Sequence, residues 1–204
     1  MARELIVTGE GVASGTPDRC LVTLALNVMA ATSSDALDQV GALVGQVLEV
    51  VLGQGVARSD VQTLTISLQD WLDKDKSVTA RVATYVLLVR VTGLEKVGRL
   101  LDQVAPVAGN SLQVQGIRLT MGEPKPVIAE ARRAAVEDAL GKARDLAAAA
   151  GVRLGKINSI DDGGGVRLGT GFSARTLAAS SSMPVEAGAS EVMVRVTITF
   201  EIED

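Results

Sequence analysis

The sequence contains no histidine, and this absence bears directly on the chemistry that the chain can perform. Histidine is the commonest general base, the usual partner of serine and cysteine nucleophiles, and a common zinc ligand. Aromatic residues make up only 2% of the 204 residues, which leaves little material for stacking bases or sugars. Lys and Arg (20) are outnumbered by Asp and Glu (24), without a basic block for DNA or anionic lipid. Hydrolase, zinc-enzyme and nucleic-acid-binding functions are therefore disfavoured.

The chain has a single cysteine, Cys20, which cannot form an intramolecular disulfide. It lies at the start of an alternating apolar segment, and no second cysteine or histidine accompanies it. We expect it to be a small buried core residue and not a nucleophile. It gives no support for an oxidising compartment.

Long apolar runs are also lacking. The first twelve residues carry charge at Arg3 and Glu4 and reach a glycine at Gly9, which leaves no room for a secretory apolar segment. The longest uncharged apolar run, residues 20–31, alternates as a strand does and is too short to span a membrane as a helix. As written, the chain is expected to be cytoplasmic, without a transmembrane segment. Export is the alternative if a signal peptide has been removed.

Three short motifs approach known binding signatures but lack essential parts of them. GEGVASG at 9–15 has glycines at the wrong spacing for a dinucleotide fingerprint and precedes a strand. Asp73, Asp75 and Ser77 have a calcium-like spacing, but the glycine and final glutamate of an EF-hand are missing. GTG at 169–171 lacks the lysine of a P-loop. We therefore expect structural turns here, and no cofactor, metal site or catalytic residue.

Residues 126–162 give the clearest structural signal, a long helix running into a strand. Apolar residues recur every three or four positions, at Ile128, Ala131, Ala135, Ala139, Ala143, Leu146 and Ala150. Pro124 and Pro126 suit the start of a helix, and Gly151 suits the position just past its end. Because the buried face is mostly alanine, we expect the helix to approach its support closely. Arg132 intrudes on this face, and we expect its charged head to reach solvent.

The other elements follow the same two periodicities. Strands are predicted at 4–8, 20–30, 61–68, 78–91, 112–121, 156–160 and 192–202. Helices are predicted from 32 to 53 and from 94 to 104, the second stopped by Pro106. Residues 9–18 are predicted as a loop or a bulged turn. Three amphipathic helices packed on a mainly antiparallel sheet of about seven strands make an α+β fold. We expect one domain over 1–204, with two sub-lobes as an alternative.

Residues 163–190 lose all periodicity and are rich in Gly, Ser and Ala, so we predict a long loop. The segment nevertheless carries six large apolar side chains: Val166, Leu168, Phe172, Leu177, Met183 and Val185. Such side chains gain about 1.5 to 3 kcal/mol each when fully buried. They can be buried on a neighbouring copy or on the same subunit, or the segment can be disordered. We advance these six residues as an oligomerisation element.

Four segments, occurring in order, resemble the SIMPL-domain family. They are IVTGEGVASGTPD at 6–18, GVARSDVQTLTISL at 55–68, GLEKVGRLLDQVAPVAGNSLQVQGIRLTM at 93–121 and ARRAAVEDALGKARDLAAAAGVRLGKINSI at 131–160. None of the four is a catalytic signature, and the specificity lies in their order. The resemblance implies an α+β fold, large ring-like homo-oligomers, a link to stress resistance and no established enzymatic chemistry.

Two functional hypotheses follow. The first is a non-enzymatic protein whose sheet edges and long loop join copies of itself into a closed ring or hollow particle. The family resemblance and the mean hydropathy of +0.29 favour it. The alternative is a small-molecule-binding protein or an enzyme, with a pocket between the helices and the sheet.

Overall fold

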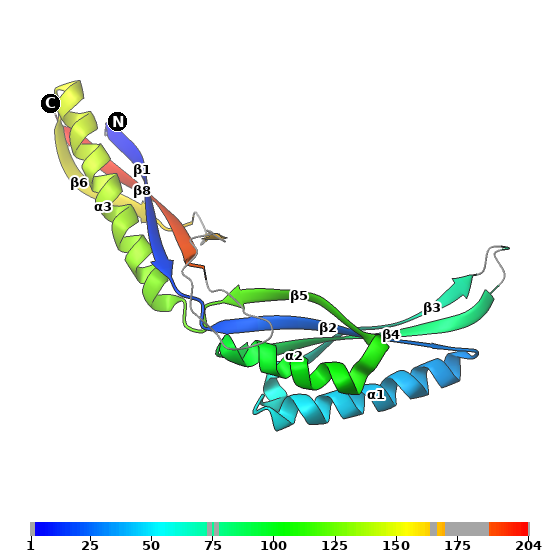
Figure 1. The fold of residues 1–204 in the computed structure, drawn as a ribbon. Coiled ribbons are helices and arrows are strands. Elements are labelled where there is room, and N and C mark those ends of the chain that lie inside the picture. The colour runs from blue at the N-terminus through cyan, green and yellow to red at the C-terminus, as the bar shows by residue number, and fades with distance from the viewer. Residues whose placement is uncertain (1–2, 73–74, 76–77, 164–166, 170–187, 204) are drawn as a thin grey trace. The chain divides into compact units, whose positions relative to one another are not determined.

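The structure, a computed structural model, describes residues 3–72, 75, 78–163, 167–169 and 188–203. The chain divides into two compact units. The described part of unit 1 comprises residues 3–17, 121–163, 167–169 and 188–203. The described part of unit 2 lies between residues 18 and 120. Each unit packs helix on antiparallel sheet, which confirms the predicted α+β class (Figure 1).

The sheet of unit 1 is built around β8 (Ser190–Glu203), the last strand along the described chain. β1 (Glu4–Gly15) pairs with one side of β8, and β6 (Arg153–Asp161) and β7 (Arg167–Gly169) pair with it as well, all antiparallel. Alternate residues of β8 are buried: Val192, Val194, Val196, Ile198 and Phe200. This alternation is the period of a strand with one face on a core.

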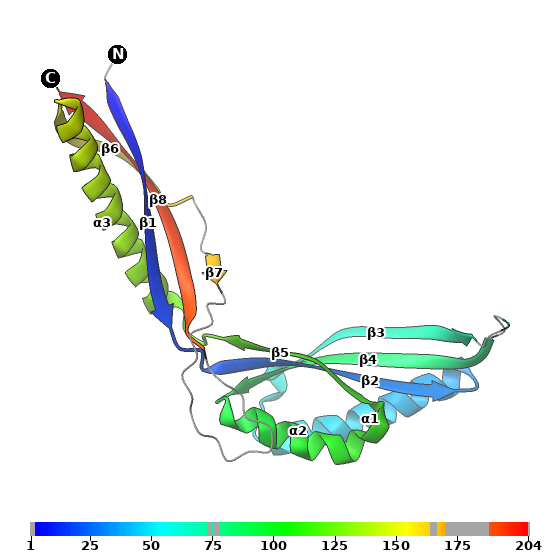
Figure 2. The same ribbon diagram turned by 45° about the horizontal axis from the view of Figure 1, so that its top comes forward.

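The long helix α3 (Lys125–Ala150) lies on this sheet, along β1 and β8 (Figure 2). Its buried residues are alanines spaced four apart: Ala131, Ala135, Ala139, Ala143 and Ala147. The helix ends at Gly151, whose φ of 69° is the left-handed conformation of a C-terminal glycine. The prediction that Leu146 and Ala150 belong to the buried face is wrong, because the stripe continues through Ala147 and leaves both exposed.

β1 runs to Gly15, so the prediction of a loop at 9–18 is wrong for residues 9–15, and only residues 16–18 connect β1 to the next strand. Gly9 and Gly11 are buried beneath α3, and a Cβ built on Gly9 would lie only 2.6 Å from the backbone nitrogen of Ala139. A Cβ on Gly11 would collide with the carbonyl oxygen of Ala131. These glycines therefore serve close helix-to-strand packing, and they do not form a turn.

The sheet of unit 2 has the order β3 (Val61–Leu72), β4 (Val78–Thr92), β2 (Arg19–Ala30), β5 (Leu112–Thr120), and every neighbouring pair is antiparallel. The helices α1 (Ser33–Gly53) and α2 (Glu95–Ala108) cover one face (Figure 2). Between them and the sheet lies a core of Val, Leu, Ala and Cys side chains.

α1 begins as predicted, with the Thr32 hydroxyl accepting a hydrogen bond from the backbone N–H of Asp35 at 3.1 Å. Its length of 21 residues and apolar composition would suffice to cross a membrane. Its residues Val40, Val47 and Val51 pack into the core of unit 2. Length and composition alone are weak evidence for a membrane span.

α2 continues past Pro106 to Ala108, so the predicted stop at this proline is wrong. The proline removes the hydrogen bond that its own N–H would have made and crowds the carbonyl four residues earlier, but only two helical residues, Val107 and Ala108, follow it. The helix instead ends at Gly109, with a φ of 53°.

The predicted loop at 163–190 contains the short strand β7, in which Leu168 pairs with Val192. The loop prediction is therefore wrong for residues 167–169 and for Ser190, the first residue of β8. Residues 164–166 and 170–187 lie outside the described residues, as do 73–74 and 76–77 in the predicted turn after β3.

Candidate functional site

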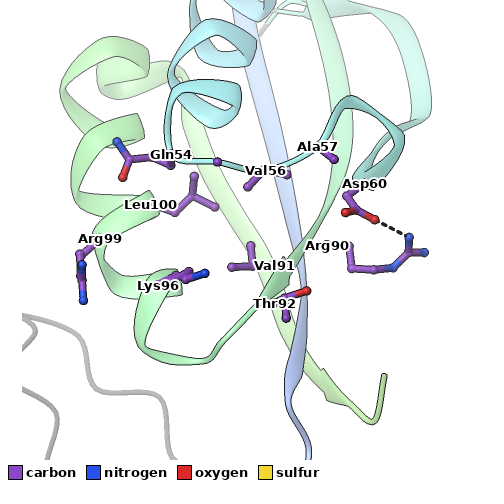
Figure 3. Close-up of a pocket in the computed structure, with 11 residues that line it drawn as sticks. Gln54, Val56, Ala57, Asp60, Arg90, Val91, Thr92, Lys96, Arg99 and Leu100 are labelled. Atoms are coloured by element: carbon purple, nitrogen blue, oxygen red, sulfur yellow. Dashed lines mark hydrogen bonds and ion pairs between the residues drawn. The ribbon is translucent and has the colours of Figure 1, made fainter. Parts of the chain in front are cut away.

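A pocket of about 230 Å³ lies in unit 2 where the end of α1, the end of β4 and the start of α2 meet. Gly55, with a φ of 81°, turns the chain after α1 and leads into the short 3₁₀ turn η1 (Arg58–Asp60), which forms one wall. The start of α2 forms the opposite wall (Figure 3). The pocket is thus located between helices and sheet, where the small-molecule hypothesis expects one.

The apolar lining of the pocket comes from Val56, Val91 and Leu100, of which Val91 and Leu100 are buried in the core. Such a lining, with a few charged groups at its rim, is typical of sites for small organic ligands.

The charged groups of the pocket are mainly cationic. Arg90 and the single lining carboxylate, Asp60, form an ion pair at 3.0 Å on the β4 side. Lys96 and Arg99 lie one turn apart on α2, and neither makes an ion pair within the described part of the chain. In Figure 3 the side chain of Lys96 points toward Val91, whereas that of Arg99 is turned outward at the rim. The uncompensated charge at the pocket is therefore positive.

Cys20 is fully buried in the core of unit 2, which confirms its predicted placement. Burial raises the pKa of its thiol to about 11, with a smaller contribution from the negative charge of Glu95. The residue is therefore protonated at neutral pH, which is the opposite of what a nucleophilic or redox-active cysteine requires.

No group of three His, Cys, Asp or Glu side chains among the described residues is arranged to hold a metal ion. The carboxylates of Asp161 and Asp162, which precede a run of glycines, each have a partner. Asp161 accepts a hydrogen bond from the N–H of Gly163 at 2.7 Å, and Asp162 pairs with Arg132 at 2.9 Å. The head of Arg132 thus lies at the surface, as predicted.

A second feature with functional potential is the apolar surface of β3, an edge strand of unit 2. Five large apolar side chains of this strand are between 39% and 56% exposed: Leu64, Ile66, Leu68, Trp71 and Leu72. Trp71 is the single tryptophan of the chain. Long exposed apolar edge strands are templates for pairing with another chain.

The edge strand β1 of unit 1 is instead bonded to α3. The N–H of Glu10 donates to the Asp138 carboxylate at 2.8 Å, and the Lys142 ammonium donates to the same carboxylate at 2.6 Å and to the Thr8 carbonyl at 3.3 Å. The hydrogen bond from Lys142, followed by the one from Glu10, lowers the pKa of Asp138. Two main-chain groups of β1 are thus already occupied by the helix.

Of the six predicted oligomerisation residues, the backbone of Leu168 is placed in β7. The other five, Val166, Phe172, Leu177, Met183 and Val185, lie outside the described residues. Their role stays a prediction.

Similarity to known proteins extends over nearly the whole chain. The model of the SIMPL family, described as a protein of unknown function (DUF541), matches residues 5–200. The chain belongs to the SIMPL family. This confirms the resemblance carried by the four ordered segments. The family description assigns no activity.

Relatives of this SIMPL chain are found in several bacteria. The 26 kDa periplasmic immunogenic proteins of Brucella melitensis biotype 1 and of Brucella abortus strain S19 are each 32% identical to it. Both alignments cover 98% of this chain and 84% of the relative. The uncharacterized protein YggE of Escherichia coli K12 is 23% identical over 76% of this chain and 64% of its own length.

The pocket of this SIMPL chain contains residues that sequence reasoning missed. In the sequence, Lys96 and Arg99 are polar positions within the predicted helix at 94–104, and Val56 lies between a predicted helix and a predicted strand. No local motif marks them, because the pocket forms only when α1, β4 and α2 meet.

Proposed function

We propose that this SIMPL-family chain is a non-enzymatic protein that assembles with copies of itself into a large, closed homo-oligomer. The observation that carries the proposal is the apolar exposed edge strand β3. An isolated exposed leucine is ordinary on a protein surface, whereas five large apolar side chains on one edge strand favour a covering partner.

The topology of unit 2 favours a second copy as that partner. Because neighbouring strands alternate in direction, the two edge strands of the sheet, β3 and β5, run opposite to each other. The β5 edge of one copy would therefore meet the β3 edge of the next as a further antiparallel pair. Such a head-to-tail contact is heterologous, and it produces a ring when the rotation between copies closes.

The oligomeric mass is the direct test, measured by size-exclusion chromatography with light scattering. We expect a mass of many subunits at micromolar concentration, and a clean monomer would refute the proposal. In the variant Ile66→Lys, an ammonium replaces an apolar side chain that is 56% exposed on β3, so the mass should fall. Ile6→Lys is the matched control, because Ile6 is 64% exposed on β1, the strand bonded to α3. Equal masses for both variants and the wild type would exclude the β3 edge.

The six apolar residues between 166 and 185 are proposed as a second assembly element. Replacing 170–187 by a short Gly/Ser linker removes Phe172, Leu177, Met183 and Val185 and leaves β7 and β8 in the chain. We expect the oligomeric mass to fall while the far-UV circular dichroism per subunit is retained. If the shortened protein keeps its wild-type mass, this element is not needed for assembly.

We infer an exported location in place of the cytoplasmic one expected from the sequence. The supporting observation is that the two Brucella relatives are named as periplasmic proteins. Fractionation of the source cell tests this, and recovery with cytoplasmic markers would refute it.

The stress-related role implied by the family resemblance belongs to the same proposal, and unchanged survival of a deletion strain under stress would count against it.

A further inference from the structure

We propose that the pocket between α1, β4 and α2 is a binding site for a small organic anion that has a short apolar tail. The tail would lie on Val56, Val91 and Leu100, and the anionic head would meet the ammonium of Lys96. This inference goes beyond self-assembly and does not depend on it, because all lining residues belong to unit 2.

The sign of the ligand's charge follows from the ion pairs at the pocket. Asp60 is the single carboxylate among the lining residues, and Arg90 already neutralises it at 3.0 Å. Lys96 and Arg99 remain without an ion partner in the described part of the chain. In a protein with a net charge of −4, such a local excess of positive charge selects anions over cations.

The volume limits the ligand's size. A water molecule occupies about 30 Å³ of liquid, so a pocket of about 230 Å³ holds roughly seven waters, or an organic molecule of a similar number of non-hydrogen atoms. The apolar lining favours a ligand with a hydrocarbon part over inorganic phosphate, because displaced water is then replaced by apolar contacts. A six-carbon carboxylate, which has eight non-hydrogen atoms, fits both limits. The matching phosphate ester has eleven, so its six-carbon tail fits the pocket and its phosphate would lie at the rim.

The test uses the full-length protein and four probes with the same tail: hexanoate, hexyl phosphate, hexanol and hexylamine. Saturation-transfer NMR and calorimetry detect binding whether or not the protein is assembled. We expect saturable binding of at least one anion at millimolar concentration or below, with weaker binding of hexanol and none of hexylamine. The anion that binds more tightly identifies the head group. Binding of hexanol as tight as that of both anions, or the lack of saturable binding of either anion, would overturn the proposal.

Substitution of Lys96 tests its assigned role. Lys96→Gln should weaken binding of the anion about tenfold or more, as expected for loss of a charged hydrogen-bond partner, and should leave hexanol binding unchanged. Lys96→Arg should retain most of the affinity, and Lys125→Gln, on α3 of unit 1, serves as the matched control for charge. Because Lys96 is exposed, these variants are expected to fold, which circular dichroism checks. Equal anion affinity for Lys96→Gln and Lys125→Gln would refute the role of Lys96.

Discussion

Substitution of Gly11 by alanine tests the packing of α3 on β1. A Cβ on Gly11 would occupy the space of the Ala131 carbonyl oxygen and the Ala135 backbone nitrogen. Both are main-chain atoms of a regular helix, so no side-chain rotation can relieve the collision. The helix would have to move away from the strand, and its buried alanines would move with it.

The expected cost follows from two destabilising effects and one stabilising effect. Insertion of a methyl group into a packed interior costs about 1 to 3 kcal/mol, and the upper end applies here because the obstructing atoms are backbone. A gap of about 0.5 to 1 Å beneath the alanines would also forfeit a quarter to a half of their dispersion attraction. Alanine also lowers the conformational entropy of the unfolded chain relative to glycine, which stabilises the folded state by only about 0.4 to 1 kcal/mol. We therefore expect a net loss of about 2 kcal/mol or more.

Urea unfolding followed by far-UV circular dichroism, which reports on the helices α1, α2 and α3 together, measures this loss. With a typical slope of about 2 kcal/mol per molar, the unfolding midpoint should fall by about 1 M. Gly116→Ala is the matched control, because Gly116 also lies in a strand but a Cβ at this position would have no other atom within 4 Å. It should be neutral or slightly stabilising. If Gly11→Ala unfolds at the same midpoint as Gly116→Ala, the close packing of α3 on β1 is refuted.

Two further predictions concern titrating groups. Native protein should not react with a thiol reagent at pH 8 until denatured, because Cys20 is buried; rapid labelling would contradict this. The pKa of the thiol is near 9.0 in the unfolded chain and about 11 in the folded one, so the folded state holds its proton more tightly. The free energy of unfolding should therefore decline by about 2 to 3 kcal/mol as the pH rises from 9 to 11. Cys20→Ala should remove that decline. Asp138→Asn should increase hydrogen exchange at the Glu10 amide, with Asp145→Asn as the control, and unchanged exchange would contradict the bond. Because the pKa of Asp138 is lowered, its contribution is present above pH 3.8 and is lost as pH falls below it.

Periodicity predicted most of the elements, because each of them carries its own signal. α1, β2 and β8 each have one face on a core, so apolar residues recur along them with the period of a helix or of a strand. That period can be found in the sequence of each element alone. Gly151 was predicted correctly as the position just past the end of α3, because capping is a local interaction.

The errors arose where a distant segment determines the conformation. Gly9 and Gly11 favour a turn when only their neighbours are considered, but α3, more than a hundred residues later, makes their lack of a side chain a packing requirement. The pocket around Lys96 could not be predicted from the sequence either, because its lining residues come from three separate segments and form no continuous motif. Pro106 shows the reverse case, in which a strong local signal for a helix end was wrong by two residues, since α2 continues through Val107 and Ala108.

The position of β8 along the chain has a consequence for synthesis on the ribosome. β1 is made early, yet its pairing partner is the last strand of the described chain to be made, and β6 and β7 depend on the same strand. All described elements of unit 2 are complete by residue 120, so this unit can fold while translation continues. The nascent chain must therefore carry β1 without its strand partner until β8 emerges, and during that interval the unpaired side of β1 is open to chaperones and to other nascent chains.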